Sequence, residues 1–311
     1  MSTRLRYSLP VAVGAALVLG LSGHAGTASA APAGAPATVA AAGSTAFGST
    51  VQWRKGETFT SSLARVEAVS GTLGVARIFQ TTPQPKIFAP LGARSAVVSF
   101  KLPPDLVLAG VYDAQFRAFF AAAPKDHPTW WSYYHEADAA FNQGRLNDFQ
   151  QFRDASSRVA RIARSAGNGQ LRNTVILTGY TANPKSGKNV ADYLPAAGLT
   201  DLVAFDNYNG WAQSNLGTYG DPTTVLGHDK AAAAAVGLPW AVAEFASTVQ
   251  NGDYQGRADF ITRFAQVAAT NGAVFVSYFD SKVGAGGTEY RLLDAPSQDA
   301  FRAIVSDQNP F

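Results

Sequence analysis

The sequence predicts a single α/β domain, a (β/α)8 or TIM barrel. Short runs of apolar and β-branched residues recur along the chain, each is followed by a polar loop and a helical stretch, and eight such units fit into about 265 residues. Strands that are apolar almost throughout and alternate with helices are typical of a parallel sheet covered on its faces. A doubly wound sheet is disfavoured because the sequence after the first strand, Phe47-Gly48-Ser49-Thr50, is no Gly-rich phosphate-binding turn.

The predicted strands share a short length and an aromatic or β-branched composition. They are Ala46–Val51, Gly74–Phe79, Ala96–Phe100, Thr129–Tyr134, Thr174–Thr178, Leu202–Phe205, Trp240–Ala243 and Val274–Phe279. Between them the spacing of apolar residues changes to the 3.6-residue period of an amphipathic helix. The clearest case is a helix from about Leu146 to Ser165, with Phe149, Phe152 and Ile162 on its apolar stripe.

The first thirty residues have the features of a secretory signal peptide. Arg4 and Arg6 form a positive n-region, and Leu9–Leu21 is an apolar stretch too short to span a bilayer. Ala28-Ser29-Ala30 then offers a cleavage site with small residues. An uncleaved membrane anchor is the alternative. We expect residues 1–30 to be removed and the protein to be secreted and extracellular, without membrane contact.

Residues 31–44 are almost entirely Ala, Pro, Gly, Thr and Val, and predict a disordered lead-in to a folded domain at 45–311. The chain holds 25 basic and 22 acidic residues, and Arg4 and Arg6 leave with the signal. The remaining balance is nearly neutral, with no basic run, so nucleic acid is not an expected partner. A monomer is the default for a secreted protein of this size.

Cysteine is absent, which excludes a thiol nucleophile and any Cys-based metal site. His127, His135 and His228 remain after the signal, and none are spaced as the two ligands of a zinc helix. No metal or other cofactor is expected.

Polar, acidic and aromatic residues gather where the predicted strands end. In a barrel of this kind the carboxyl ends of the strands surround one cavity, which is where function resides. The residues at or just beyond these ends that are candidates for a site are Arg77, Lys101, His135, Glu136, Asp206, Tyr208, Trp211, Glu244 and Tyr278.

Glu136 and Glu244 are the most informative of these residues. Each ends an apolar, aromatic-rich strand, where an ionised carboxylate is expensive to place. They follow the fourth and seventh strands, so their side chains can face each other across the barrel mouth. Retaining glycoside hydrolysis requires such a pair, with the carboxyl groups roughly 5–5.5 Å apart. The aromatic surroundings of Glu136 favour a protonated general acid, while a donor such as the Tyr208 hydroxyl would keep Glu244 ionised as the nucleophile.

Several motifs resemble glycoside hydrolase family 26, within clan A of retaining barrel enzymes. They are His135-Glu136 after an aromatic strand, Ala243-Glu244-Phe245, Asp206-Asn207-Tyr208, Phe47-Gly48-Ser49-Thr50 and Gly110-Val111-Tyr112-Asp113. The resemblance spans about Phe47 to the C-terminus. It implies that Glu136 is the acid/base, Glu244 the nucleophile, His135 an orienting residue and Tyr208 a partner of the nucleophile.

The resemblance also implies endo attack on a β-linked polysaccharide, most often β-mannan, with mixed-linkage glucan or xylan as minority substrates. The sequence departs from the family after the acid, where Ala137-Asp138 replaces the usual Pro-Glu. The clan usually has a Trp on the eighth strand that stacks on sugar; here Tyr278 or Phe279 is the substitute.

Other interpretations of these residues stay open. Arg77 and Lys101 suit sugar hydroxyls or a salt bridge to a carboxylate, and Asp206 suits a supporting network. Trp130 and Trp131 are adjacent on one strand, so at most one of them can face the cavity. Trp211, in the loop after the sixth strand, is the better candidate for stacking on a sugar. Asp280 is the competing second carboxylate. A secreted barrel that binds glycan or cell wall without cleaving it is the alternative class.

Overall fold

The structure, a computed structural model, describes residues 45–210, 217–283 and 288–306, and its parallel strands close into an eight-stranded barrel in chain order. The predicted (β/α)8 fold is confirmed. The strands are β1 (Ala46–Thr50), β2 (Val75–Gln80), β3 (Ser95–Phe100), β4 (Thr129–Tyr133), β5 (Leu171–Thr178), β6 (Leu202–Asn209), β7 (Trp240–Ser247) and β8 (Phe275–Tyr278).

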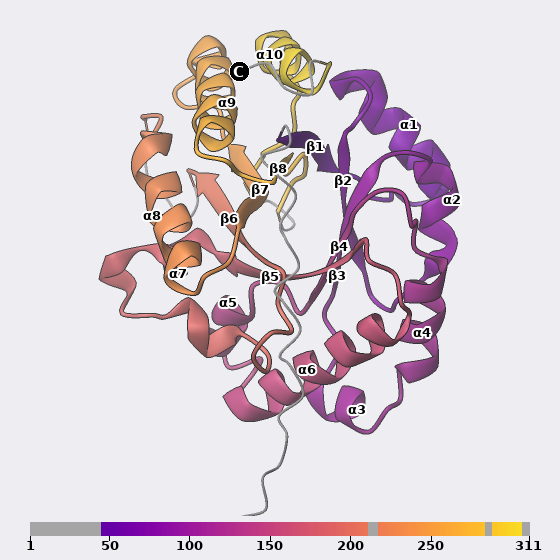
Figure 1. The fold of residues 1–311 in the computed structure, drawn as a ribbon. Coiled ribbons are helices and arrows are strands. Elements are labelled where there is room, and N and C mark those ends of the chain that lie inside the picture. Colours follow the sequence, from indigo (N-terminus) through magenta and orange to yellow (C-terminus); the bar gives the residue numbers. More distant parts are fainter. Residues whose placement is uncertain (1–44, 211–216, 284–287, 307–311) are drawn as a thin grey trace, which may run out of the picture. The chain divides into compact units, whose positions relative to one another are not determined.

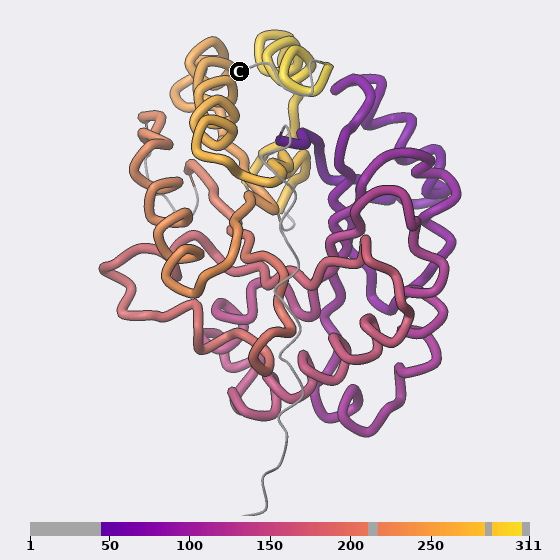
Figure 2. The backbone as a smooth tube through the Cα atoms, in the orientation of Figure 1, coloured from indigo at the N-terminus to yellow at the C-terminus, as the bar shows by residue number. Residues whose placement is uncertain are grey.

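Helices form an outer ring around these strands (Figure 1). They are α1 (Phe59–Ser70), α2 (Phe88–Leu91), α3 (Pro104–Leu108), α4 (Asp113–Ala122), α5 (Ala137–Asn142), α6 (Phe149–Ser165), α7 (Gly179–Ala182), α8 (Pro222–Ala235), α9 (Tyr254–Thr270) and α10 (Ala295–Ser306). Short 3₁₀ turns lie at Pro85–Ile87, Pro184–Ser186 and Val190–Tyr193. The chain colours run once around the ring (Figure 2), and β1 pairs with β8 to close it.

The predicted strand positions agree with the structure, while several ends differ. β6 and β7 each continue four residues beyond the apolar run that predicted them, because polar residues at the barrel mouth still pair in register as far as Asn209 and Ser247. The helix predicted from Leu146 begins at Phe149. The Asp148 side chain accepts a hydrogen bond from the Gln151 amide at 2.9 Å, and this N-cap sets the start.

Two apolar layers follow from the alternation of side chains along the strands. One fills the inside of the barrel and contains Val75, Val97, Trp130, Ile176 and Phe275. The other, much larger, lies between the barrel and its helices. The inner layer forms the floor beneath the side chains at the carboxyl ends of the strands.

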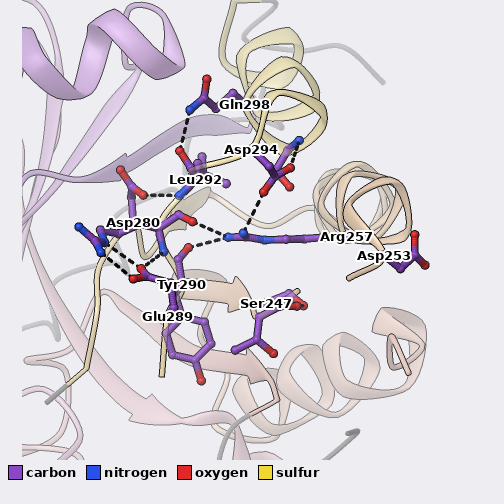
Figure 3. Close-up of polar contacts among 12 residues, drawn as sticks. Ser247, Asp253, Arg257, Asp280, Glu289, Tyr290, Leu292, Asp294 and Gln298 are labelled. Atoms are coloured by element: carbon purple, nitrogen blue, oxygen red, sulfur yellow. Dashed lines mark hydrogen bonds and ion pairs between the residues drawn. The ribbon is translucent and has the colours of Figure 1, made fainter. Parts of the chain in front are cut away.

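A buried arginine on α9 fastens the segment that leads from β8 to α10. Arg257 is 2% exposed and donates to the Asp294 carboxylate at 3.2 Å, to the Tyr278 hydroxyl at 2.7 Å and to the Tyr290 carbonyl at 2.7 Å. Figure 3 shows its guanidinium reaching from α9 toward Tyr290 and Asp294. Removing one member of such a network leaves the other buried charge without its partner.

We expect Arg257→Ala to lower the free energy of unfolding by roughly 3 kcal/mol, because Asp294 then loses its ion pair and the Tyr290 carbonyl a donor. Urea denaturation followed by circular dichroism measures this change. The matched control is Arg263→Ala on the same helix, whose ion pair with Asp221 is exposed and should contribute less than about 1 kcal/mol. Equal losses in the two variants would contradict this role of Arg257.

Candidate active site

The connection after β4 presents Glu136 through an unusual backbone. Tyr134 and Glu136 both have positive φ angles, 59° and 54°, on either side of His135. For residues with a side chain this left-handed conformation costs on the order of 1–2 kcal/mol each. Hydrogen bonds to both neighbouring strands hold it: the Tyr134 amide donates to the Phe100 carbonyl at 2.6 Å, and the Glu136 amide to the Ile176 carbonyl at 2.8 Å.

Asp138 anchors the same turn from the next element. Its carboxylate is fully buried and accepts hydrogen bonds from the Thr178 amide at 3.2 Å, from the Thr178 hydroxyl, and from the Thr181 hydroxyl at 2.7 Å. The start of α5, where Glu136 is the N-cap residue, is therefore tied to the end of β5. In the sequence Asp138 stands out only as a departure from a family motif, and nothing near it in the chain indicates this role.

A bulge in β7 turns Glu244 toward the inside of the barrel. The pairing with β6 passes from Phe205–Val242 to Asp206–Glu244, so one extra residue, Ala243, lies on β7. Ala243 belongs to the inner apolar layer, and in a regular strand its neighbour would point outward. The bulge reverses that phase, which lets Glu244 also point inward.

Two donors hold the Glu244 carboxylate, whose side chain is 5% exposed. Arg77 donates to Oε1 at 2.8 Å, and the Tyr208 hydroxyl donates to Oε2. Arg77 is itself fully buried, donates to the Ser99 hydroxyl at 2.7 Å, and lies 4.1 Å from the centre of the Phe79 ring. The network fixes the orientation of the Glu244 carboxylate.

Glu136 lies in a different electrostatic environment. Its side chain is 27% exposed, and Lys101 approaches it with an Nζ–Oε2 distance of 3.6 Å. Burial raises the pKa of the Glu136 carboxyl, the negative charge of Glu244 raises it further, and the Lys101 ammonium acts in the opposite direction. The two glutamates therefore lie close enough to influence each other, and Glu136 is the one displaced toward its protonated form.

Asp206 is a third carboxyl group at this mouth. It is 4% exposed, pairs with Glu244 in the strand register, and neither of its oxygens has a hydrogen-bond partner within the described residues. Burial raises the pKa of Asp206 well above its ordinary value, and the charges of Glu244 and Glu136 add to that rise. The raised pKa favours the protonated form of Asp206, and that form spares the site a third negative charge.

His135 packs against the site as a neutral ring. Burial lowers its pKa well below the ordinary value, with Arg77 and Lys101 contributing by repulsion. Its ring centre lies 5.1 Å from that of Phe79, and its buried Nδ1 bonds to no other residue that the structure describes. His135 therefore contacts the site through the packing of its ring, and within the described residues it makes no hydrogen bond through Nδ1.

The expectation that Tyr278 contacts a substrate is corrected by the structure. Tyr278 is 0% exposed, its hydroxyl bonds to Arg257 and to the Tyr290 carbonyl, and its ring packs against Phe245. It therefore points outward toward the helices. Phe279, the other candidate on this strand, lies 5.6 Å from the Tyr208 ring between ring centres and belongs to the site wall.

The structure places two of the three tryptophans that the sequence offered as candidates for stacking on a sugar. Trp131 points outward and packs on Phe120, while Trp130 points inward and packs on Phe275 in the apolar layer. Trp211 lies outside the described residues. Within the described ranges, no group of three or more His, Asp and Glu side chains is arranged to hold a metal ion. The structure thus brings together Arg77, Lys101, His135, Glu136, Asp206, Tyr208 and Glu244.

Neither a known family model nor a curated protein matches the chain. Solved structures do. A Bacteroidetes-affiliated GH5 cellulase has a TM-score of 0.59 at 11% identity, covering 85% of this chain and 92% of its own. An endo-β-1,4-mannanase double mutant from Cellulomonas fimi has a TM-score of 0.59 at 13% identity, covering 85% and 71%.

The exo-β-1,4-mannosidase Op5Man5 from Opitutaceae bacterium strain TAV5 has a TM-score of 0.60 at 12% identity, covering 86% of this chain and 60% of its own. At such identities the likeness shows the fold, a (β/α)8 barrel of one domain.

We expect Asp206→Asn to stabilise the fold at pH 7, on the order of 1 kcal/mol. Folding raises the pKa of Asp206, so the aspartate opposes folding increasingly as pH rises above the unfolded value of about 3.9. The gain in unfolding free energy should be small at pH 3.5 and larger at pH 7. Urea denaturation at both values measures it, with the exposed Asp259→Asn as control. A gain that is independent of pH would count against the raised pKa.

Proposed function

We propose that this protein is a retaining glycoside hydrolase of clan A that cleaves a β-linked polysaccharide, with Glu136 as acid/base and Glu244 as nucleophile. The observation that carries the proposal is the electrostatic difference between two neighbouring carboxyl groups at the barrel mouth. Burial and the charge of Glu244 displace Glu136 toward its protonated form, while Arg77 and Tyr208 hold Glu244 by hydrogen bonds to its two oxygens.

These two states match the two steps of the reaction. In the first, a Glu244 oxygen bonds to the anomeric carbon as its bond to the glycosidic oxygen breaks, and Glu136 gives that oxygen a proton. In the second, Glu136 takes a proton from water, and the water oxygen displaces Glu244 from the sugar. Each Glu244 oxygen accepts one hydrogen bond from Arg77 or Tyr208 and keeps a further lone pair for the carbon.

The substrate class is inferred from two supports. The similar structures are described as a cellulase, a mannanase and a mannosidase. The motifs around Glu136 and Glu244 resemble family 26, which favours endo attack on β-mannan. Mixed-linkage glucan and xylan are the other substrates to test, and a barrel that binds glycan without cleaving it is the competing outcome.

Secretion is the setting that the N-terminal sequence predicts for such an enzyme, with polysaccharide as its partner and a monomer as its form. Across 45–210, 217–283 and 288–306, none of the helices combines the length and apolar content that a membrane span requires. Cleavage after residue 30 is tested by N-terminal sequencing of the protein recovered from the culture medium.

Glu244→Ala should lose at least about a thousandfold in turnover, since covalent attack is removed. Added azide should restore part of the activity and form a glycosyl azide of opposite anomeric configuration to the natural product. Reducing-sugar release from mannan, glucan and xylan measures the loss, and NMR identifies the anomers. Glu136→Gln should be equally impaired on polysaccharide but much less so on a dinitrophenyl glycoside, whose leaving group needs no proton.

Glu67→Gln is the matched control, because Glu67 lies on α1 and is ion-paired with Arg94; this variant should be fully active. Wild-type activity in both Glu136→Gln and Glu244→Ala would remove the proposal. Binding without release by the wild type on every glycan would favour the non-catalytic barrel.

Lys101→Met should move the alkaline limb of the kcat/KM profile to higher pH. A general acid works only when protonated, so activity falls as pH rises through its pKa, and the Lys101 ammonium lowers the pKa of Glu136. Without that charge the Glu136 proton is retained to higher pH. Lys101→Arg keeps the charge and should keep the limb near its wild-type position. A shift to lower pH in Lys101→Met would show that another group sets this limb.

A further inference from the structure

A small pocket opens beside Glu136, between the β3–α3 connection and the loop that precedes α6. Its volume is about 280 Å³, and its polar lining comes from Lys101, Asp105, Tyr134, Arg145, Asn147, Asp148 and Gln151. The pocket adjoins the candidate active site through Lys101, which contacts the Glu136 carboxyl. One of its walls is Tyr134, a residue held in the left-handed conformation described above.

Most polar side chains of this pocket are not used by the fold, the exceptions being Lys101, which pairs with Glu136, and Asp148, which caps α6. No side-chain hydrogen bond or ion pair to another described residue is made by Asp105, Tyr134, Arg145, Asn147 or Gln151. Convergent polar groups without internal partners in a concave site are typical of a binding site.

A larger groove on the outer helices provides the contrast. Its volume is about 570 Å³, but its central carboxylate, Asp113, is already bonded by Arg158 at 2.7 Å and by Arg117 at 3.2 Å. Both carboxylates of that groove, Asp113 and Asp154, are bonded by other side chains, whereas Asp105 in the pocket beside Glu136 has no such bond among the described residues.

The place of the pocket relative to the two glutamates indicates which part of a glycan it would receive. The sugar attacked by Glu244 lies between the two carboxyl groups, and the glycosidic oxygen faces Glu136. Beyond that oxygen the chain continues on the leaving-group side. Lys101 contacts Glu136 and lines the pocket, so the pocket begins where the leaving group would pass.

We propose that this pocket is the subsite for the sugar ring on the leaving-group side, and that Arg145 and Gln151 bind its hydroxyl groups. The proposal rests on the glycoside hydrolase function and adds to it the residues that hold the departing sugar. The volume equals that of roughly nine water molecules at about 30 Å³ each, below the range of drug-sized sites, and suits a single ring.

The charges of the lining select a neutral ring. Two cations, Lys101 and Arg145, are balanced by two carboxylates, Asp105 and Asp148. The carboxylate of a uronic acid would be attracted by the two cations and repelled by the two carboxylates, so its charge brings no net gain in binding. Hydroxyl groups both donate and accept hydrogen bonds, so a neutral pyranose can use both kinds of partner.

The test compares two substrates of the same glycone. β-1,4-Mannohexaose fills the pocket, whereas β-mannobiosyl fluoride leaves it empty because its leaving group is a fluoride ion. Arg145→Ala and Gln151→Ala should each lose about tenfold in kcat/KM for the hexaose relative to the fluoride, as expected for a lost hydrogen bond of about 1.4 kcal/mol. Cellohexaose and cellobiosyl fluoride replace these probes if glucan is the polymer cleaved.

Gln150→Ala is the matched control. Gln150 precedes Gln151, and its amide bonds to Asp154 away from the pocket, so the ratio for the two substrates should remain that of wild type. Equal losses on both substrates, or no loss on either, in Arg145→Ala and Gln151→Ala would overturn the subsite while leaving the hydrolase function intact. Failure of the wild type to turn over both probes in either series would instead remove the hydrolase function and the subsite with it.

A second measurement uses the pocket as an acceptor site. With β-mannobiosyl fluoride as donor, mannobiose should be glycosylated in preference to a disaccharide that carries glucuronic acid at the accepting end. The ratio of transfer to hydrolysis should fall about tenfold in Arg145→Ala. Preference for the acidic acceptor would overturn the neutral-sugar assignment.

Discussion

The ion pair between Arg77 and Glu244 is the interaction on which the mouth of this barrel depends. Both side chains are almost completely buried, and an unpaired charge at either position would be strongly destabilising. The surroundings complete the pair: Ser99 accepts from Arg77, the Phe79 ring lies under its guanidinium, and Tyr208 donates to the second Glu244 oxygen. The apolar inner layer excludes water from below, which strengthens each of these bonds and makes every one of them necessary.

Regular strands could not place both glutamates here. Glu136 reaches the mouth because the chain turns through two left-handed residues after β4, and Glu244 points inward because a bulge reverses the phase of β7. Such distortions persist only where neighbouring structure holds them, and Asp138 performs that task on β4 through its bonds to Thr178 and Thr181. The Arg257 network acts similarly on the other side of the mouth, where Tyr290 packs on Tyr208 at 5.1 Å between ring centres.

These distortions mark how far the sequence could predict the molecule. The strands were predictable because runs such as the one ending at Glu244 are apolar on both faces, which is typical of parallel barrels. The same property hid the direction of Tyr278, since a strand that is apolar on both faces does not reveal which residues face inward. The role of Asp138 was hidden for another reason. Its partners lie 40 and 43 positions further along the chain, and only the closed barrel brings them together.

The unequal exposure of the two glutamates suits the roles proposed for them. A nucleophile meets only the sugar, so Glu244 can be fixed by Arg77 and Tyr208 with 5% of its side chain exposed. An acid/base must give its proton to a departing group and recover one from water, so it has to remain reachable, and Glu136 is 27% exposed. Burial still raises the pKa of the Glu136 carboxyl, and the nearby charge of Glu244 raises it further, because a like charge disfavours ionisation even where water has access. In the proposed mechanism Glu244 thereby helps to keep Glu136 protonated, and that repulsion ends once Glu244 has bonded to the sugar and lost its charge. In that mechanism Glu136 is then free to ionise and to serve as the base of the second step, so the charge of one buried carboxylate contributes to the order in which both groups act.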